Sequence, residues 1–164
     1  MEPLNETQVI QNLRQTKDPS AQYYAAWWLG KMRSQHPDAI PLLLRALEAL
    51  DATPIDPEQR GVALNAIRAL GLLRDTRAEQ PLLALLHSND YTVREEVVRT
   101  LGAMGRCGAA EGIRALLASG LEGAGAEQPS SPLLNEPCEA LLEALGDIGA
   151  VSYTHLRAHE TNVD

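Results

Sequence analysis

The chain has 164 residues, 45% of them hydrophobic, and a formal net charge of −8 at pH 7. This length and apolar content allow one domain with a proper core and exclude a globally disordered chain. The negative charge, without a Lys/Arg cluster, argues against nucleic acids and acidic membranes as partners. The sequence has no long apolar run and no signal peptide, which predicts a cytoplasmic protein.

A short helix over residues 4–16 is the first predicted element, because apolar residues recur there at helical spacing. Its apolar face comprises Leu4, Val9, Ile10 and Leu13. The next predicted helix lies within Asp18 to Arg33 and holds both tryptophans of the chain. Asp18 or Ser20 can cap its N-terminus, and Pro19 suits its first turn.

The segment that ends at Gly30 recurs three times along the chain, each time ending in Leu-Gly. The four windows span residues 21–30, 62–71, 93–102 and 137–146. Each of the first three is followed by a second apolar helical pattern, over residues 41–47, 81–86 and 112–117. Because helix, glycine turn and helix repeat, we predict an all-α fold, an α-solenoid built as a superhelix of helix pairs. The first helices, with exposed faces lining one concave side, are expected near residues 19–33, 58–73, 91–104 and 137–146.

Two of the three intervals between the repeated glycines are long and carry insertions. Residues 51–57 are rich in proline and acidic residues, and residues 119–137 are rich in glycine, serine and proline, so both are predicted to be loops. The second loop is too long to be only a turn. It is therefore either a functional flap or a mobile excursion.

The repeat alignment divides each first helix into a core stripe and an outer face. The stripe comprises the positions one, five and nine residues before the glycine. The positions three, six and seven residues before it are polar in most copies, and we expect them to face solvent. In the first copy these outer positions hold Trp27, Tyr24 and Tyr23, whereas Trp28 is expected in the core.

Large aromatic side chains on a solvent-facing helix surface favour a binding function, because exposed apolar area is otherwise unfavourable. We therefore interpret Tyr23, Tyr24 and Trp27 as a binding surface. The alternative is that they pack under the N-terminal helix and cap the solenoid. At the position of Trp27, the second and third copies carry Arg68 and Arg99.

Residues 151–164 break the repeat pattern, and residues 151–161 resemble the in-frame translation of a transposase sequencing adaptor. We interpret this segment as non-native and expect it to pack on nothing. His155 and His159 are for this reason not interpreted as metal ligands, and no metal site is predicted. Residues 1–150 are then expected to be the N-terminal part of a longer HEAT-like repeat protein that is truncated here.

Three stretches, residues 18–33, 89–95 and 136–146, resemble one known family, and the Tyr-Tyr-Ala-Ala-Trp-Trp block in the first is the most specific. Over residues 8–150 the chain is similar to the E subunit of the heterodimeric E/F-type phycocyanobilin lyases, a PBS-lyase HEAT-like repeat family. The resemblance implies a cyanobacterial HEAT-like solenoid that works with an F-type lyase subunit. Such proteins attach phycocyanobilin through a thioether to a cysteine of the phycocyanin alpha subunit, in phycobilisome biogenesis.

This resemblance implies a ligand for the aromatic side chains. A bilin is a flexible, conjugated tetrapyrrole with two propionates, so aromatic rings can hold its pyrroles and arginines its carboxylates. The implied bilin-binding residues are Tyr23, Tyr24, Trp27, Arg68 and Arg99. Phycocyanobilin is then the substrate, and no cofactor is expected.

The catalytic residues stay unassigned, since the thiol nucleophile belongs to the acceptor protein. Glu95 and Glu96 are candidates for stabilising a protonated bilin, and a solvated helix face explains them as well. Cys107 and Cys138 are interpreted as ordinary thiols rather than carriers of a bilin adduct. Two alternative functions stay open: a non-catalytic HEAT scaffold that docks a protein, and a relative that isomerises, removes or chaperones bilins.

Overall fold

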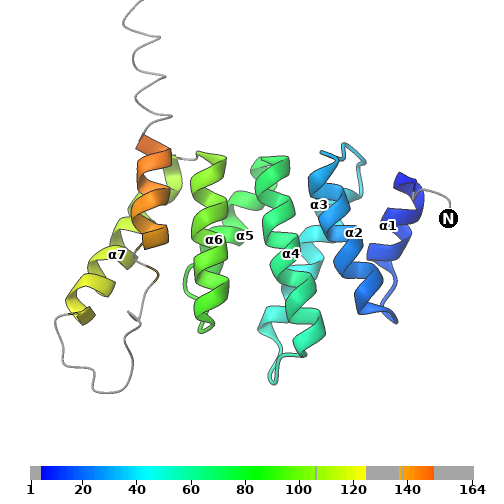
Figure 1. Ribbon diagram of the computed structural model, residues 1–164, viewed down its shortest axis with the longest axis horizontal. Coiled ribbons are helices and arrows are strands. Elements are labelled where there is room, and N and C mark those ends of the chain that lie inside the picture. The colour runs from blue at the N-terminus through cyan, green and yellow to red at the C-terminus, as the bar shows by residue number, and fades with distance from the viewer. Residues whose placement is uncertain (1–4, 106, 125–136, 138, 150–164) are drawn as a thin grey trace, which may run out of the picture. The chain divides into compact units, whose positions relative to one another are not determined.

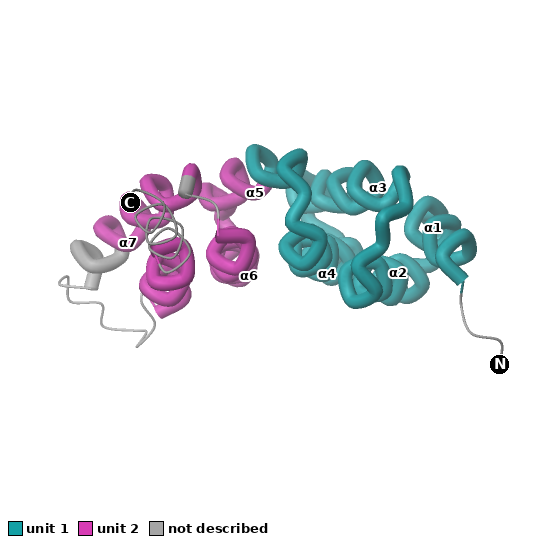
Figure 2. Tube along the Cα trace, turned by 90° about the horizontal axis from the view of Figure 1, so that it is seen from above, with its two compact units in different colours: residues 1–81 teal, residues 82–164 magenta. Residues whose placement is uncertain are grey.

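The computed structural model describes residues 5–105, 107–124, 137 and 139–149 (Figure 1). The chain divides into two compact units, Met1–Pro81 and Leu82–Asp164, which Figure 2 colours separately. The described residues contain helices and no strand, so the all-α prediction is confirmed. Among these residues, no helix combines the length and the apolarity that crossing a membrane requires.

The helices of the two units follow the predicted repeat closely. Unit 1 contains α1 (Glu6–Arg14), α2 (Pro19–Lys31), α3 (Ala39–Ala46), the 3-10 helix η1 (Leu47–Asp51), α4 (Pro57–Leu73) and the 3-10 helix η2 (Thr76–Ala78). At the boundary, α5 (Glu79–Leu85) leads into unit 2, which contains α6 (Tyr91–Met104), the 3-10 helix η3 (Cys107–Ala109), α7 (Ala110–Ala124) and an unlabelled helix over residues 139–149. Thus α2, α4, α6 and the helix at residues 139–149 are the four predicted first helices.

The prediction of a loop over residues 119–137 is wrong at its start, because α7 stays helical to Ala124. Glycine lowers helix stability by about 1 kcal/mol relative to alanine but does not forbid a helix. Residues 125–136 and the adaptor-like segment 151–164 lie outside the described residues. The predictions for these segments, and for the extent of the native protein, therefore stay predictions.

An aspartate precedes each of the helices α2, α4 and α6 and caps its N-terminus. The carboxylates of Asp18, Asp56 and Asp90 each accept hydrogen bonds from backbone N–H groups of the first turn. These contacts satisfy donors that have no partner within the helix, and they place a negative charge at the positive end of the helix dipole. Asp18, rather than Ser20, is therefore the cap of α2.

The predicted core stripe is buried in almost every copy. The leucine before the repeated glycine is fully buried in α2, α4 and α6, and so are most of the residues five and nine positions before the glycine. The exceptions are Ala21 and Leu145, which are half-buried. Trp28, which was predicted to lie in the core, is also half-buried.

Neighbouring first helices approach each other at the repeated glycine. Within unit 1, α2 and α4 lie side by side (Figures 1 and 2), and a Cβ on Gly30 would lie 2.7 Å from the Cα of Ala69. Within unit 2, a Cβ on Gly102 would lie 2.8 Å from the Cα of Ala144. At Gly30 and Gly102 the Leu-Gly pair therefore combines a buried leucine with a glycine whose missing side chain lets the next helix come close.

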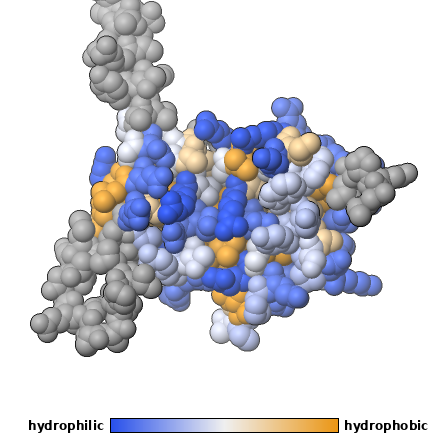
Figure 3. All heavy atoms as spheres, viewed as in Figure 1, coloured by the Kyte–Doolittle hydropathy of each residue, from blue (hydrophilic) through white to orange (hydrophobic). Residues whose placement is uncertain are grey.

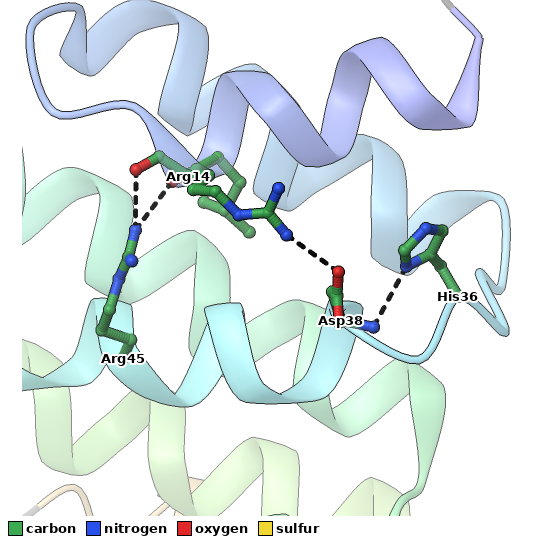
Figure 4. Close-up of polar contacts among 5 residues, drawn as sticks. Arg14, His36, Asp38 and Arg45 are labelled. Atoms are coloured by element: carbon green, nitrogen blue, oxygen red, sulfur yellow. Dashed lines mark hydrogen bonds and ion pairs between the residues drawn. The ribbon is translucent and has the colours of Figure 1, made fainter.

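Polar contacts attach the N-terminal helix α1 to α3 (Figure 4). The Arg45 Nη2 donates to the backbone oxygens of Arg14 and Leu13, at 2.9 and 3.4 Å, where α1 ends. The Arg14 Nη2 pairs with the Asp38 Oδ2 at 2.8 Å, and the Asp38 backbone N–H donates to the His36 Nδ1 at 3.0 Å. Since Val9, Ile10 and Leu13 of α1 are also buried, α1 has a fixed place in unit 1. That burial covers its apolar face.

Candidate functional site

Tyr23, Tyr24 and Trp27 form an exposed cluster on α2, here called the aromatic surface. Their exposed fractions are 44%, 64% and 49%. The rings of Tyr24 and Trp27 meet edge to face, with centroids 6.1 Å apart and an interplanar angle of 74°. The three side chains line an open depression of about 280 Å³. These exposures contradict the alternative that the three aromatics are packed under the N-terminal helix.

The face of the molecule drawn in Figure 3 shows hydrophobic residues at separate points among hydrophilic ones. Exposed aliphatic area on that face is therefore scattered rather than continuous. Against this background a cluster of three exposed aromatic rings on one helix is unusual, because large apolar side chains of a folded chain are preferentially covered. The aromatic surface thus has the character of a site that a ligand or partner covers.

The outer positions of the repeat behave differently from one another. The position three residues before the glycine is exposed in all four copies, as predicted, and holds Trp27, Arg68, Arg99 and Glu143. The prediction that the positions six and seven before it mostly face solvent is wrong: Leu64, Asn65 and Ala140 are buried, and Glu95 and Glu96 are half-buried. In unit 1 the reason is visible, because this side of α4 packs against α2.

Arg68 lies next to the aromatic surface through a short chain of hydrogen bonds. The Asn65 Nδ2 donates to the backbone oxygen of Tyr23 at 3.1 Å, and the Arg68 Nη1 donates to the Asn65 Oδ1 at 3.1 Å. The Tyr23 ring lies beside Gly61 of α4, since a Cβ there would be 3.9 Å from the Tyr23 Cδ2. Unit 1 therefore places a guanidinium group and three aromatic rings on adjacent faces of α2 and α4.

Arg99 has a different environment, inside unit 2. Its Nη2 pairs with the Glu95 Oε1 at 3.1 Å and its Nη1 with the Glu143 Oε2 at 2.9 Å. The hydrogen bonds to Glu95 and then to Glu143 raise the pKa of Arg99 above its ordinary value. A ligand carboxylate at Arg99 would compete with both glutamates. Because Arg99, Glu95 and Glu96 belong to unit 2, their place in one site with the aromatic surface stays a prediction.

Sequence reasoning missed Asn65, which it counted only as a polar residue of an outer face. The available signal was a single amide within the otherwise apolar run Val62–Ile67. A polar residue in such a run either faces solvent or is buried with partners, and the pattern alone does not separate the two cases. The hydrogen bond to the Tyr23 backbone shows that the second case holds.

The paired helices and the Leu-Gly repeat define an α-helical repeat protein of the HEAT-like class, and comparison with known families agrees. The sequence profile of the family described as PBS lyase HEAT-like repeat matches residues 21–49, and that of HEAT repeats matches residues 55–124. The first match contains the whole aromatic surface. The predicted class, a HEAT-like α-solenoid, is thereby confirmed.

Curated relatives show which named proteins the chain resembles. The bilin biosynthesis protein RpcE of Synechococcus sp. (strain WH8020) is 54% identical over 150 residues, covering 92% of this chain and 57% of the relative. The phycocyanobilin lyase subunit alpha of Picosynechococcus sp. (strain ATCC 27264 / PCC 7002 / PR-6) is 43% identical over 147 residues, covering 88% of this chain and 53% of the relative.

A solved structure gives the same result. The complex of CpcE and CpcF of phycocyanin lyase from Nostoc sp. PCC7120 contains a chain that superposes with a TM-score of 0.73 and 37% sequence identity, over 93% of this chain and 56% of that one. The chain therefore contains a PBS-lyase HEAT-like repeat and is similar, over most of its own length, to the alpha subunits of phycocyanobilin lyase. It spans about half the length of the curated relatives it matches.

Proposed function

We propose that the chain is part of the alpha, or E-type, subunit of a phycocyanobilin lyase. With an F-type subunit, the complete protein attaches phycocyanobilin to a cysteine of the phycocyanin alpha subunit in the cytoplasm. The names of the relatives and the structure of the CpcE and CpcF complex support this proposal. The observation that carries it is the aromatic surface, which lies within the PBS-lyase repeat and is exposed in this chain.

The chemistry needs little from the lyase beyond orientation. Thioether formation adds the S–H of the acceptor cysteine across a carbon–carbon double bond of the bilin, so a C–S bond forms, the proton passes to the bilin and no group leaves. In this proposal the aromatic surface holds the pyrrole rings, and Arg68 and Arg99 are candidates for the propionates. Holding the bilin in one orientation towards the thiol raises the effective concentration of the reacting groups. The bilin is the substrate, and the proposal includes no cofactor.

The catalytic candidates Glu95 and Glu96 have defined but different environments. Glu95 is bonded to Arg99, as described above, and Glu96 is half-buried. A carboxylate close to the pyrrole nitrogens would favour the protonated, electrophilic bilin. Neither residue is assigned a role beyond this candidacy.

A second candidate function has its own observation. The relative that shares 54% identity is named for bilin biosynthesis and not for attachment. The same aromatic surface would also suit a subunit that isomerises or chaperones a bilin. A protein-docking scaffold is a further alternative, in which a partner protein covers the aromatic surface.

The test replaces Trp27 by leucine, with Leu142→Ala as a control that changes an exposed apolar side chain in the other unit. Phycocyanobilin is titrated into each protein, the shift of its visible absorption is recorded, and binding of an F-type subunit is measured separately. We expect Trp27→Leu to weaken bilin binding up to about tenfold, since contact with an aromatic ring contributes about 0.5–1.5 kcal/mol beyond its buried area. Binding of the F-type subunit should be unchanged.

Two results would assign the surface differently. If Trp27→Leu lost only the binding of the F-type subunit, the aromatic surface would be a protein interface. If the bilin spectrum and affinity were the same for wild type and Trp27→Leu, the surface would have no part in bilin binding. The Leu142→Ala control is expected to match the wild type in both measurements.

A further inference from the structure

Asn65 is a buried polar residue at the contact between α2 and α4. It is only 5% exposed, while its neighbours Leu64 and Ala66 are apolar and buried. Burying an amide is unfavourable unless its polar atoms find partners, and an aliphatic side chain would fill the same space without that requirement. Both polar atoms of Asn65 have partners, one on each side of the helix contact. These two hydrogen bonds indicate that Asn65 does more than fill space between the helices.

The two hydrogen bonds of Asn65 connect the backbone of α2 to the guanidinium of Arg68. The Nδ2 is anchored on the backbone oxygen of Tyr23, which belongs to a rigid helix, and the Oδ1 receives the guanidinium of Arg68. Arg68 is exposed, so a ligand in solvent can reach it. Arginine otherwise has many side-chain conformations, and a fixed acceptor at 3.1 Å restricts them. Asn65 thus holds the guanidinium on the side of α4 that adjoins the aromatic surface.

We propose that Asn65 is a positioning residue that holds Arg68 for the carboxylate of a conjugated ligand bound on the aromatic surface. The proposal rests on the proposed function and refines it: the site selects a bilin through a free propionate at Arg68. The matching chemistry is a planar ring system that carries a carboxylate on a short chain. Rings lie on Tyr24 and Trp27, and the carboxylate pairs with the guanidinium, which is a strong charge-assisted contact. A ligand with the same rings but an esterified propionate loses that contact.

The test compares two ligands, phycocyanobilin and its dimethyl ester, by the absorption shift on binding. Four proteins are used: the wild-type chain, Arg68→Gln, Asn65→Leu, and Arg77→Gln as a control for the loss of an exposed arginine. Wild type and Arg77→Gln should bind the acid about tenfold more tightly than the ester, the effect of one charge-assisted hydrogen bond. Arg68→Gln should lose most of this preference for the acid. Asn65→Leu should weaken the acid severalfold and leave the ester unchanged.

The ester separates positioning from a merely structural role of Asn65. If Asn65→Leu weakened both ligands equally, or if Arg68→Gln kept the full wild-type preference for the acid, the inference would be overturned while bilin binding itself stood. If the wild-type chain bound neither ligand, the proposed function would fail, and the inference with it. The far-ultraviolet circular dichroism and thermal midpoint of Asn65→Leu show whether it folds. Arg68→Gln also removes the contact between Asn65 and Arg68, so it allows the same comparison of acid and ester. Because it changes an exposed residue, it leaves the core undisturbed.

Discussion

Replacing Gly102 by alanine is expected to destabilise the protein by roughly 1–3 kcal/mol, although alanine favours helices more than glycine does. The new Cβ would lie 2.8 Å from both the Cα and the Cβ of Ala144. Neither atom can rotate away, because one is backbone and the other is attached directly to it. The two helices must therefore separate, which loosens the packing along their whole contact. Urea unfolding measures the change in free energy.

Gly146 provides a matched control within the same unit and at the same place in the repeat. A Cβ on Gly146 would meet nothing within 4 Å. The substitution Gly146→Ala should therefore be neutral or stabilising by up to about 1 kcal/mol, the difference in helix propensity between the two residues. Equal effects at Gly102 and Gly146 would show that the close approach of neighbouring helices is not the reason for the repeated glycine.

The second large effect is expected for Ile67→Ala, which should lower the free energy of unfolding by about 2–5 kcal/mol. Ile67 lies four residues before its repeat glycine and is completely buried in α4. The truncation removes three buried carbon atoms and leaves a cavity, because close-packed helices cannot collapse fully around it.

Leu142 occupies the same repeat position in the helix at residues 139–149, but it is 57% exposed. Its truncation to alanine removes the same number of carbon atoms, mostly from solvent, so the change should stay below about 1 kcal/mol. If Leu142→Ala were as destabilising as Ile67→Ala, the loss of stability at this repeat position would not depend on the burial that the structure shows. Both variants are measured by the same urea unfolding.

The repeat in the sequence was sufficient to predict the helices and most of the core. Leucine, alanine and glycine recur at fixed spacing, and aspartate and proline mark the starts of α2 and α4, so the period and the ends are both visible in the chain. The burial of Asn65 and Ala140 was not predictable in this way. The helical period indicates which residues share a face. Whether a given face is buried depends on how closely a neighbouring helix packs against it, and the period does not specify that distance.

The candidate site was predicted in part. Tyr23, Tyr24 and Trp27 stand off the core stripe, and that departure from the other copies was enough to predict their exposure. The contacts of the arginines were not accessible, because Arg99 pairs with a glutamate 44 residues away and Arg68 with a buried amide. Such contacts depend on side-chain direction across a helix pair, which no spacing in the sequence specifies.

A crystal structure of the chain with phycocyanobilin is the most direct test of the account. The predicted result is a tetrapyrrole whose rings contact Tyr24 and Trp27, with one propionate on the Arg68 guanidinium and the Asn65 bridge to Tyr23 intact. A bilin bound elsewhere on the chain, with Tyr24 and Trp27 still exposed to solvent, would contradict the assignment of the aromatic surface.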